Sequence, residues 1–302
     1  MGAGHDVALV VSQPDRRRGR GPATTPSPVK AAAVELGLPV TDRVDDVAAA
    51  GVDLGVVVAF GRLVRPHVLA AVPMVNLHYS LLPRWRGAAP VERAILAGDD
   101  TTGVCLMALE EGLDTGGVHA RATLPLGPRA TAAEVVDQLT TLGTDLLLTA
   151  LDEGLGEPSP QVGPVTYAAK LTAEDRHLDW SRAAEHLDRV VRVGGAWTTF
   201  RGRRLKVHEA EPEPGAGPGG PPGTLEPATA VVATGGGGLR LLTVQPEGRA
   251  VVAAAAWVRG ARLAPGEGLG RSPAPPSGPG GHPASDHPAP LREEPGPGTG
   301  RP

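Results

Sequence analysis

An amide, an imidazole and a carboxylate in this sequence are groups that one active site could use together, and the first two lie close together in the chain. Asn76 and His78 end an apolar run that starts at Val72. On a strand, residues two apart project from the same face. An amide can donate a hydrogen bond to developing negative charge, and an imidazole exchanges protons near neutral pH. This pair therefore indicates one wall of an active site.

The third side chain is Asp114, which stands in a glycine-flanked segment at residues 112–116. The distance from His78 along the chain is that of a strand-helix-strand unit, so we predict a return to a neighbouring parallel strand. Taken singly, such a histidine is more often structural or solvated, such an asparagine a strand-end hydrogen bonder, and such an aspartate a turn residue. Only the ordered combination favours catalysis.

Composition restricts the class of protein. The chain has 302 residues, 41% hydrophobic and 21% charged, which suffices for a substantial core and two domains. A net charge of −4 excludes a strongly basic nucleic-acid binder, so RNA contacts would need local clusters. The single cysteine, Cys105, cannot form an intrachain disulfide, and its apolar surroundings predict a buried thiol. Because the sequence has no apolar run of membrane length and no secretory signal, we expect a cytoplasmic protein. We also expect a monomer.

The first half alternates strand and helix patterns. Valine-rich runs at residues 6–12 and 52–60 are typical of strands covered on both faces. Helices are predicted at residues 28–36, at residues 88–96 and from Thr131, which has Glu134 at the capping-box position, to about residue 151. This alternation predicts an α/β fold with a doubly wound parallel sheet and ligands at the strands' carboxyl ends.

The second half has a different pattern. A proline-containing stretch at residues 157–160 precedes a helix at residues 180–193 and short strands separated by glycine and proline clusters, which predicts a small open β-barrel. The tail is rich in proline and glycine and is predicted to be disordered. The predicted domains are a catalytic domain at 1–156, a linker at 157–165, a barrel at 166–269 and a tail at 270–302.

The order of the motifs resembles that of a known family. Asn76-Leu77-His78, then Ser80-Leu81-Leu82-Pro83, then Asp114 between glycines resemble the formyltransferases that use 10-formyltetrahydrofolate. Gln13-Pro14-Asp15, Gly19-Arg20-Gly21 and Pro26-Ser27-Pro28-Val29-Lys30 are similar to a loop of the methionyl-tRNA formyltransferase family. The resemblance covers residues 4 to about 265. It implies transfer of the formyl group to the α-amino group of methionyl initiator tRNA, with a C-terminal barrel of the oligonucleotide-binding kind.

The resemblance also implies roles for single residues. Formyl transfer to an amine passes through a tetrahedral carbon with a developing oxyanion, while the amine loses a proton. Asn76 would donate to the oxyanion, His78 would donate to it or exchange protons, and Asp114 would orient the imidazole, with no need for a metal. The folate contacts implied are Ser80, Leu81, Leu82 and Pro83, although a strand exit with apolar anchors explains the same residues.

Two basic stretches are candidate contacts for tRNA. Residues 16–20 carry four guanidinium groups, which suit phosphate, and the resemblance places Arg20 at the acceptor stem. An isolated cluster of this kind is more often an ordinary charged loop. Strand alternation puts Arg204, Lys206 and His208 on one face, either as a phosphate-facing stripe or as a solvated edge. The expected tRNA contacts are Arg16, Arg17, Arg18, Arg20, Lys30, Arg204 and Lys206.

One departure from the family bears on folding. The family normally begins with a further strand, a Gly-Thr-Pro turn and a helix before the segment that matches residues 4–7. Without that strand, ladder groups would be unpaired and apolar sheet surface uncovered. We expect that the start codon was assigned too late; an in-frame stop upstream without such a coding segment would contradict this.

Two other functions fit parts of the sequence. A formyltransferase could act on an amino sugar nucleotide or glycinamide ribonucleotide, but such small acceptors need no second basic platform. A noncatalytic tRNA-binding remnant would explain the missing strand and would bind tRNA without turnover.

Overall fold

A computed structural model describes residues 4–17, 24–213, 215, 217–264 and 267–270. The chain separates into two units, residues 1–271 and 272–302, and all described residues belong to the first. The predicted tail, apart from Gly270, and the side chain of Arg16 lie outside the description. Within the described ranges, no helix has the length and apolar character needed to cross a bilayer.

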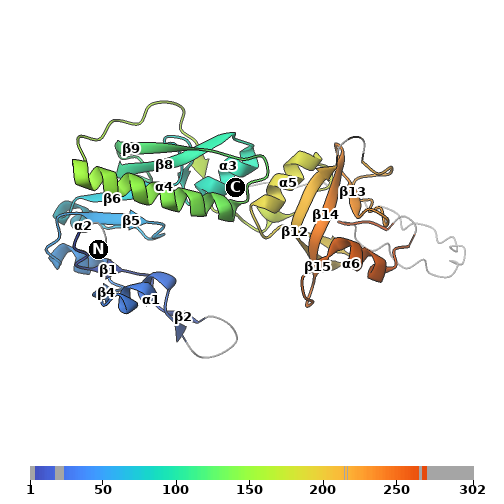
Figure 1. Cartoon of the computed structure of the whole chain (residues 1–302), viewed down its shortest axis with the longest axis horizontal. Helices are drawn as coiled ribbons and strands as arrows, with labels where there is room; N and C mark the ends of the chain where they lie inside the picture. The colour runs from blue at the N-terminus through green and yellow to red at the C-terminus, as the bar shows by residue number, and fades with distance from the viewer. Residues whose placement is uncertain (1–3, 18–23, 214, 216, 265–266, 271–302) are drawn as a thin grey trace, which may run out of the picture. The chain divides into compact units, whose positions relative to one another are not determined.

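The sheet that carries the candidate residues is mixed (Figure 1). Its strands, in spatial order, are β5 (Gly55–Val58), β6 (Met74–His78), β8 (Thr101–Ala108) and β9 (Val118–Pro125). β5 and β6 are parallel, whereas β6 with β8 and β8 with β9 are antiparallel. The predicted return on a parallel strand is therefore wrong. Helix α3 (Pro90–Ala97) ends near the carboxyl end of β6, where His78 pairs with Cys105, so the chain enters β8 from that end.

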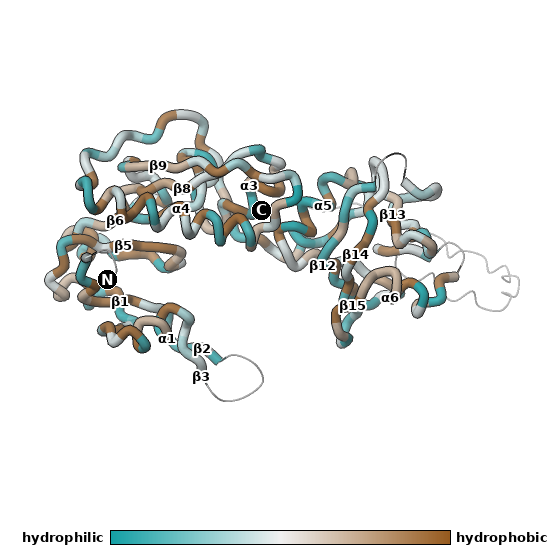
Figure 2. Tube along the Cα trace, in the orientation of Figure 1, coloured by the Kyte–Doolittle hydropathy of each residue, from teal (hydrophilic) through white to brown (hydrophobic). Residues whose placement is uncertain are grey.

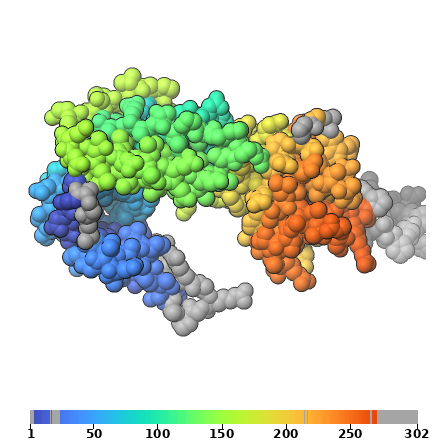
Figure 3. All heavy atoms as spheres, in the orientation of Figure 1, coloured from blue at the N-terminus to red at the C-terminus, as the bar shows by residue number. Residues whose placement is uncertain are grey.

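Helix α4 (Ala132–Glu153) covers one face of this sheet. Val75 and Leu77 of β6 belong to the same buried cluster as Val135 and Leu139 of α4. Because side chains alternate along a strand, Asn76 and His78 project from the other face. The yellow-green atoms of the helix form an outer layer over the green strands (Figure 3). The predicted capping box is confirmed, since Thr131 and Glu134 each accept a backbone hydrogen bond from the other.

The N-terminal segment forms short separate pairings. Its elements are β1 (Val10–Val11), β2 (Arg16–Arg17), β3 (Thr24–Thr25), α1 (Pro28–Glu35), β4 (Val40–Thr41), η1 (Val44–Ala49) and α2 (Pro66–Ala71). β1 pairs with β4, and in the described ranges neither shares a ladder with β5. Val56 and Val58 of β5 are 42% and 44% exposed, and this strand is strongly apolar (Figure 2).

The second half contains a curled antiparallel sheet next to two helices. Its elements are β10 (Tyr167–Ala168), η2 (Glu174–Arg176), α5 (Ala184–Arg192), β11 (Trp197–Phe200), β12 (Arg203–Glu213), β13 (Val231–Ala233), β14 (Gly238–Pro246), β15 (Val252–Ala253) and α6 (Ala254–Ala261). The strand order is β11-β12-β14-β13, and β15 pairs with β14. A register shift next to Val207 bends β12. Leu187 and Val191 of α5 pack with Leu205 and Leu239 in one buried core. The predicted α/β fold with a second antiparallel domain is confirmed.

Candidate active site

The three candidate catalytic residues line one cavity of about 580 Å3. Asn76 and His78 come from the end of β6, as their spacing predicted. Asp114 comes from the loop after β8, where Leu109 N–H donates to the carbonyl of Met74 and the chain then doubles back along the sheet. β8 ends beside the amino end of β6, and the loop that follows brings Asp114 back to the cavity lined by Asn76 and His78. The predicted meeting of the three side chains is confirmed, although by another path.

The imidazole of His78 is held at one nitrogen and left available at the other. Nε2 lies 2.8 Å from the main-chain oxygen of Trp85, and the side chain is 5% exposed. A carbonyl only accepts hydrogen bonds, so Nε2 carries a hydrogen. Nδ1 lies 3.6 Å from Oδ2 of Asp114, beyond direct hydrogen-bond range. Nδ1 is therefore the ring nitrogen that faces the carboxylate of Asp114 and the cavity.

The carboxylate of Asp114 is positioned by residues near His78. The N–H of Gly87 donates to Oδ2 at 2.7 Å. Asp114 has a φ of 51°, in the left-handed region that aspartate tolerates better than most residues. Gly87 lies in the strand β7 (Arg86–Gly87), which pairs with β10. Residues 85–87 therefore contact both the imidazole of His78 and the carboxylate of Asp114.

Trp85 connects His78 to a wider hydrogen-bond network. Its N–H donates to Oγ1 of Thr166 at 2.8 Å, and its indole Nε1 donates to Asp99 at 2.8 Å. Burial opposes ionisation of Asp99, but hydrogen bonds from Arg84 and Trp85 outweigh it and hold the pKa of Asp99 below its ordinary value. Trp85 is therefore anchored at its backbone and its side chain, which fixes the carbonyl that His78 contacts.

Asn76 is half-buried in the cavity wall. Its side-chain amide makes no hydrogen bond to any residue in the described part of the chain. A half-buried amide facing a cavity can donate to a bound molecule at little reorganisation cost. The position of Asn76 suits the predicted role of an oxyanion donor.

The sequence analysis missed an apolar wall of the cavity. Residues 59–64 follow β5 and contribute Phe60, Leu63 and Val64, and Tyr79 lies on another side. β5 and β6 are parallel neighbours, so their carboxyl ends adjoin. The rule that ligands bind at the carboxyl ends of parallel strands could have identified this loop.

The expected folate contacts Ser80, Leu81, Leu82 and Pro83 are not among the residues that line the cavity. Ser80 is fully buried, and its hydroxyl donates to the carbonyl of Arg84 at 2.6 Å. Leu82 is 1% exposed and packs with Cys105, Met107 and Val118. The burial of Ser80 and Leu82 agrees with the alternative of a strand exit with apolar anchors. Folate contacts of residues 80–83 stay a prediction.

Cys105 and the potential metal ligands give no sign of further chemistry in the described residues. Cys105 is buried, and burial raises the pKa of its thiol, which disfavours a nucleophilic thiolate. Within the described ranges, no group of three or more His, Cys, Asp or Glu side chains is arranged to hold a metal ion.

The first basic stretch is described only in part. Arg17 is exposed and pairs with Thr24 across the β2–β3 hairpin. Arg18 and Arg20 lie outside the described residues, as does the side chain of Arg16. Lys30 contacts both carboxylate oxygens of Asp15, at 2.9 and 3.0 Å, so its charge is locally balanced. Contacts of these residues with tRNA stay predictions.

The second basic stretch has the predicted alternation. Arg204, Lys206 and His208 are exposed, while Leu205 and Val207 between them are 1% exposed. The guanidinium of Arg204 lies 4.1 Å from the ring centre of Trp197. An exposed arginine stacked on an aromatic ring, next to a lysine, is compatible with a phosphate-binding face.

Comparisons with known proteins match both halves of the chain. The family model described as formyl transferase matches residues 2–151, and the model described as formyl transferase, C-terminal domain, matches residues 170–262. A methionyl-tRNA formyltransferase of Symbiobacterium thermophilum is 41% identical over 90% of this chain and 92% of that protein. One of Thermus thermophilus is 43% identical over 88% of this chain and 92% of that protein.

Solved structures show the same fold at low identity. HypX from Aquifex aeolicus in complex with tetrahydrofolic acid has a TM-score of 0.57 at 21% identity, over 75% of this chain and 43% of that one. The N-formyltransferase of Helicobacter canadensis, in complex with folinic acid and dTDP-3-aminofucose, has a TM-score of 0.56 at 14% identity, over 72% of this chain and 81% of that one.

Proposed function

This chain belongs to the formyl transferase family, and we propose that it transfers the formyl group of 10-formyltetrahydrofolate to the α-amino group of methionine on initiator tRNA. The observation that carries the proposal is the convergence of Asn76, His78 and Asp114 on one cavity. Relatives named methionyl-tRNA formyltransferase, 41–43% identical over most of both chains, support the acceptor. Location in the cytoplasm and the monomeric state stay predictions.

Each catalytic side chain has one task. The amine nitrogen attacks the formyl carbon, the carbonyl oxygen becomes an oxyanion, and the free amide of Asn76 donates to it. Nδ1 of His78 takes the proton that the amine loses, and Asp114 stabilises the imidazolium. When the tetrahedral carbon collapses, N10 of the folate leaves and takes that proton. The products are the formylated amine and tetrahydrofolate.

The cavity suits a folate as the formyl donor. Its volume of about 580 Å3 lies within the range of about 300–1,000 Å3 that is usual for small-molecule sites. Phe60, Leu63 and Val64 provide apolar surface for the flat ring system, close to the polar residues of β6. The family uses folate derivatives, and the similar fold of HypX holds tetrahydrofolic acid.

Local basic groups support a tRNA acceptor despite the net negative charge. Arg204, Lys206 and Trp197 form an exposed face on the second domain, a platform that a small acceptor does not need. Contacts from the first stretch complete the proposal: Arg16, Arg17, Arg18, Arg20 and Lys30.

Formylation of methionyl initiator tRNA, measured with 10-formyltetrahydrofolate, tests the function. We expect His78→Ala to lower turnover by about 100-fold or more, with binding of tRNA unchanged, because the proton acceptor is lost. An amino sugar nucleotide and glycinamide ribonucleotide are assayed in parallel, and transfer only to one of these would refute the tRNA acceptor. Binding of tRNA without any turnover would instead identify a noncatalytic remnant.

A further inference from the structure

Gln161 lies in the segment that composition predicted to be a simple linker, yet its side chain reaches the active site. Nε2 donates to the carbonyls of Asp114 and Gly116, each at 2.8 Å. Oε1 accepts from Nε and Nη2 of Arg86, at 3.1 and 2.7 Å. Carbonyls only accept and a guanidinium only donates, so the partners determine the orientation of the amide.

The partners of Gln161 lie on both sides of the catalytic pair. Arg86 stands between Trp85, whose carbonyl contacts Nε2 of His78, and Gly87, whose N–H donates to Asp114. The carbonyl of Asp114 itself accepts from Gln161. One glutamine therefore connects the segment that holds the imidazole to the loop that holds the carboxylate.

The spacing of the catalytic pair depends on such outside support. Nδ1 of His78 and Oδ2 of Asp114 are 3.6 Å apart, so no direct hydrogen bond fixes their distance. Asp114 also has a positive φ, and neighbouring glycines at 112 and 116 give the loop conformational freedom. The two carbonyls bound by Gln161 bracket the turn at this point of the loop.

We propose that Gln161 is a positioning residue, which holds the loop of Asp114 against residues 85–87 so that the carboxylate faces Nδ1 of His78. Catalytic groups need positions accurate to a fraction of an ångström, and supporting hydrogen bonds supply that accuracy. The kinetic part of this inference rests on the proposed formyl transfer.

The fold does not depend on Gln161. Ser159 exchanges two backbone hydrogen bonds with Val118, and the pairing of β10 with β7 holds the far end of the same segment. These main-chain contacts remain when the side chain is changed. Variants at Gln161 are therefore expected to fold, and their defects to be local.

Two substitutions test the role kinetically. Gln161→Glu keeps the size and the acceptor for Arg86 but presents only oxygen to the two carbonyls, and Gln161→Leu removes all four hydrogen bonds. We expect each to lower kcat by about 10- to 100-fold, with the KM for folate and for tRNA changed by no more than about twofold. Gln138→Glu, the same change on the exposed side of α4, is the control and should leave both parameters unchanged.

A double variant separates positioning from general structural damage. In an Asp114→Asn background, Gln161→Leu should lower the residual kcat by less than about twofold, because its effect passes through Asp114. A full loss in both backgrounds would overturn the proposal, as would a wild-type kcat in both single variants.

Amide hydrogen exchange gives a readout that does not need turnover. Gln161→Leu should raise exchange at residues 112–116 and at the N–H of Gly87, while α6 stays unchanged as an internal reference. Unchanged exchange at those amides would overturn the positioning role whether or not the enzyme is active. If the wild type transfers no formyl group, the proposed function is refuted. Increased exchange in Gln161→Leu would then still support the positioning role.

Discussion

One main-chain oxygen determines which nitrogen of His78 is left for chemistry. Because the carbonyl of Trp85 accepts the hydrogen of Nε2, the proposed mechanism uses Nδ1, which lies opposite Asp114. Asparagine at position 114 would keep the shape of the side chain but remove the charge that stabilises the imidazolium. We therefore expect substitutions of His78 and Asp114 to have strongly non-additive effects on turnover.

A substitution of Gly87 tests the position of the Asp114 carboxylate, because the N–H of Gly87 donates a hydrogen bond to it. Its φ is 117°, and a Cβ atom would lie 2.9 Å from the carbonyl oxygen of Ala168. We expect Gly87→Ala to lower the free energy of unfolding by about 2 kcal/mol or more and to lower kcat, since the N–H that binds Asp114 must move. Urea denaturation and formylation rates measure the two effects.

Gly248 provides the matched control for that substitution. It has a φ of 69°, but open space surrounds the position of a Cβ atom. Gly248→Ala should lower the free energy of unfolding by about 1–2 kcal/mol and leave kcat unchanged. Equal kcat for the two alanine variants would contradict the role of Gly87.

At the scale of elements, the sequence predicted the features that are determined by residues close together in the chain. The spacing of Asn76 and His78 predicted a shared face, and Thr131 with Glu134 predicted the start of α4, because both features are encoded within a few residues. The order of the motifs predicted that Asp114 meets Asn76 and His78, and its carboxylate lies 3.6 Å from Nδ1 of His78. Helices α1, α3, α4 and α5 were predicted with errors of up to about four residues at their ends, whereas α2 and α6 were not predicted.

What the sequence did not reveal depends on contacts between distant segments. The antiparallel direction of β8 is set by the point at which α3 returns the chain to the sheet. Composition near residue 158 indicated a linker, although β10 pairs with β7 and Gln161 bonds to residues 45 and 47 positions away. Local pattern contains no information on such partners.

The cap of α4 gives a prediction at this scale. Oγ1 of Thr131 accepts from the N–H of Glu134 at 3.3 Å. Thr131→Ala should lower the free energy of unfolding by about 1 kcal/mol, because a helix N–H loses its partner. Thr144→Ala, at an exposed position inside the same helix, should be neutral or slightly stabilising. Thermal unfolding compares them, and equal melting temperatures would contradict the capping role.

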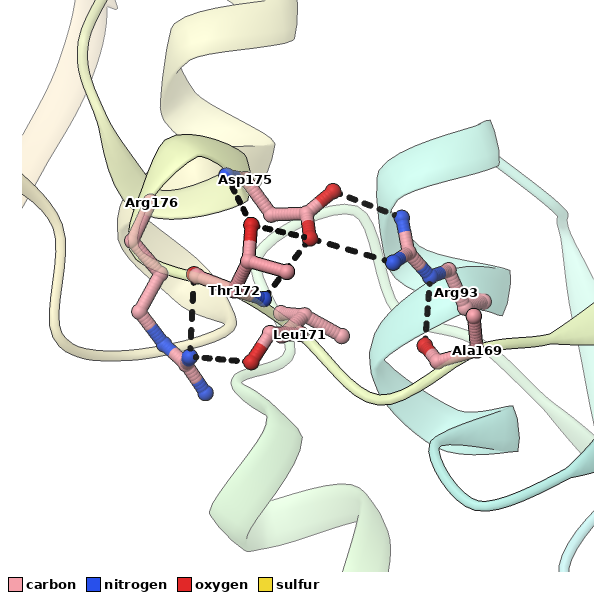
Figure 4. Close-up of polar contacts among 6 residues, drawn as sticks. All are labelled: Arg93, Ala169, Leu171, Thr172, Asp175 and Arg176. Carbon is pink, nitrogen blue, oxygen red and sulfur yellow. Dashed lines mark hydrogen bonds and ion pairs between the residues drawn. The ribbon is translucent and has the colours of Figure 1, made fainter.

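At the scale of the whole described chain, charged contacts tie the two domains together. Arg93 of α3 donates to both oxygens of Asp175, at 2.8 and 3.1 Å, and to the carbonyl of Ala169 (Figure 4). Asp188 of α5 accepts from Arg129 at 2.6 Å and from Arg192 at 2.9 Å.

Asp188 is expected to be the energetically dominant acid of the junction. It is 4% exposed and binds two arginines, of which Arg192 is itself largely buried. Asp188→Ala should lower the free energy of unfolding by about 3 kcal/mol, because a buried guanidinium loses its counter-charge. Asp45→Ala, which breaks an exposed pair with Arg65, should change it by no more than about 1 kcal/mol. Similar values for the two variants in urea denaturation would contradict this ranking.

The contribution of Asp175 to the stability of the junction depends on pH. Hydrogen bonds from Arg93 and from the N–H of Thr172 lower the pKa of Asp175 from 3.8 to about 2. A lowered pKa in the folded state means that the carboxylate stabilises the fold fully above pH 4, and that this contribution is lost as the pH falls from about 4 to about 2. The difference in free energy of unfolding between wild type and Asp175→Asn should therefore be constant above about pH 5 and shrink toward zero in acid. Arg93→Met removes the hydrogen bond to Ala169 as well, so its difference should shrink over the same pH range without reaching zero. Urea denaturation across this range measures both differences, and a difference that stays constant down to pH 2 would show that ionised Asp175 does not hold the domains together.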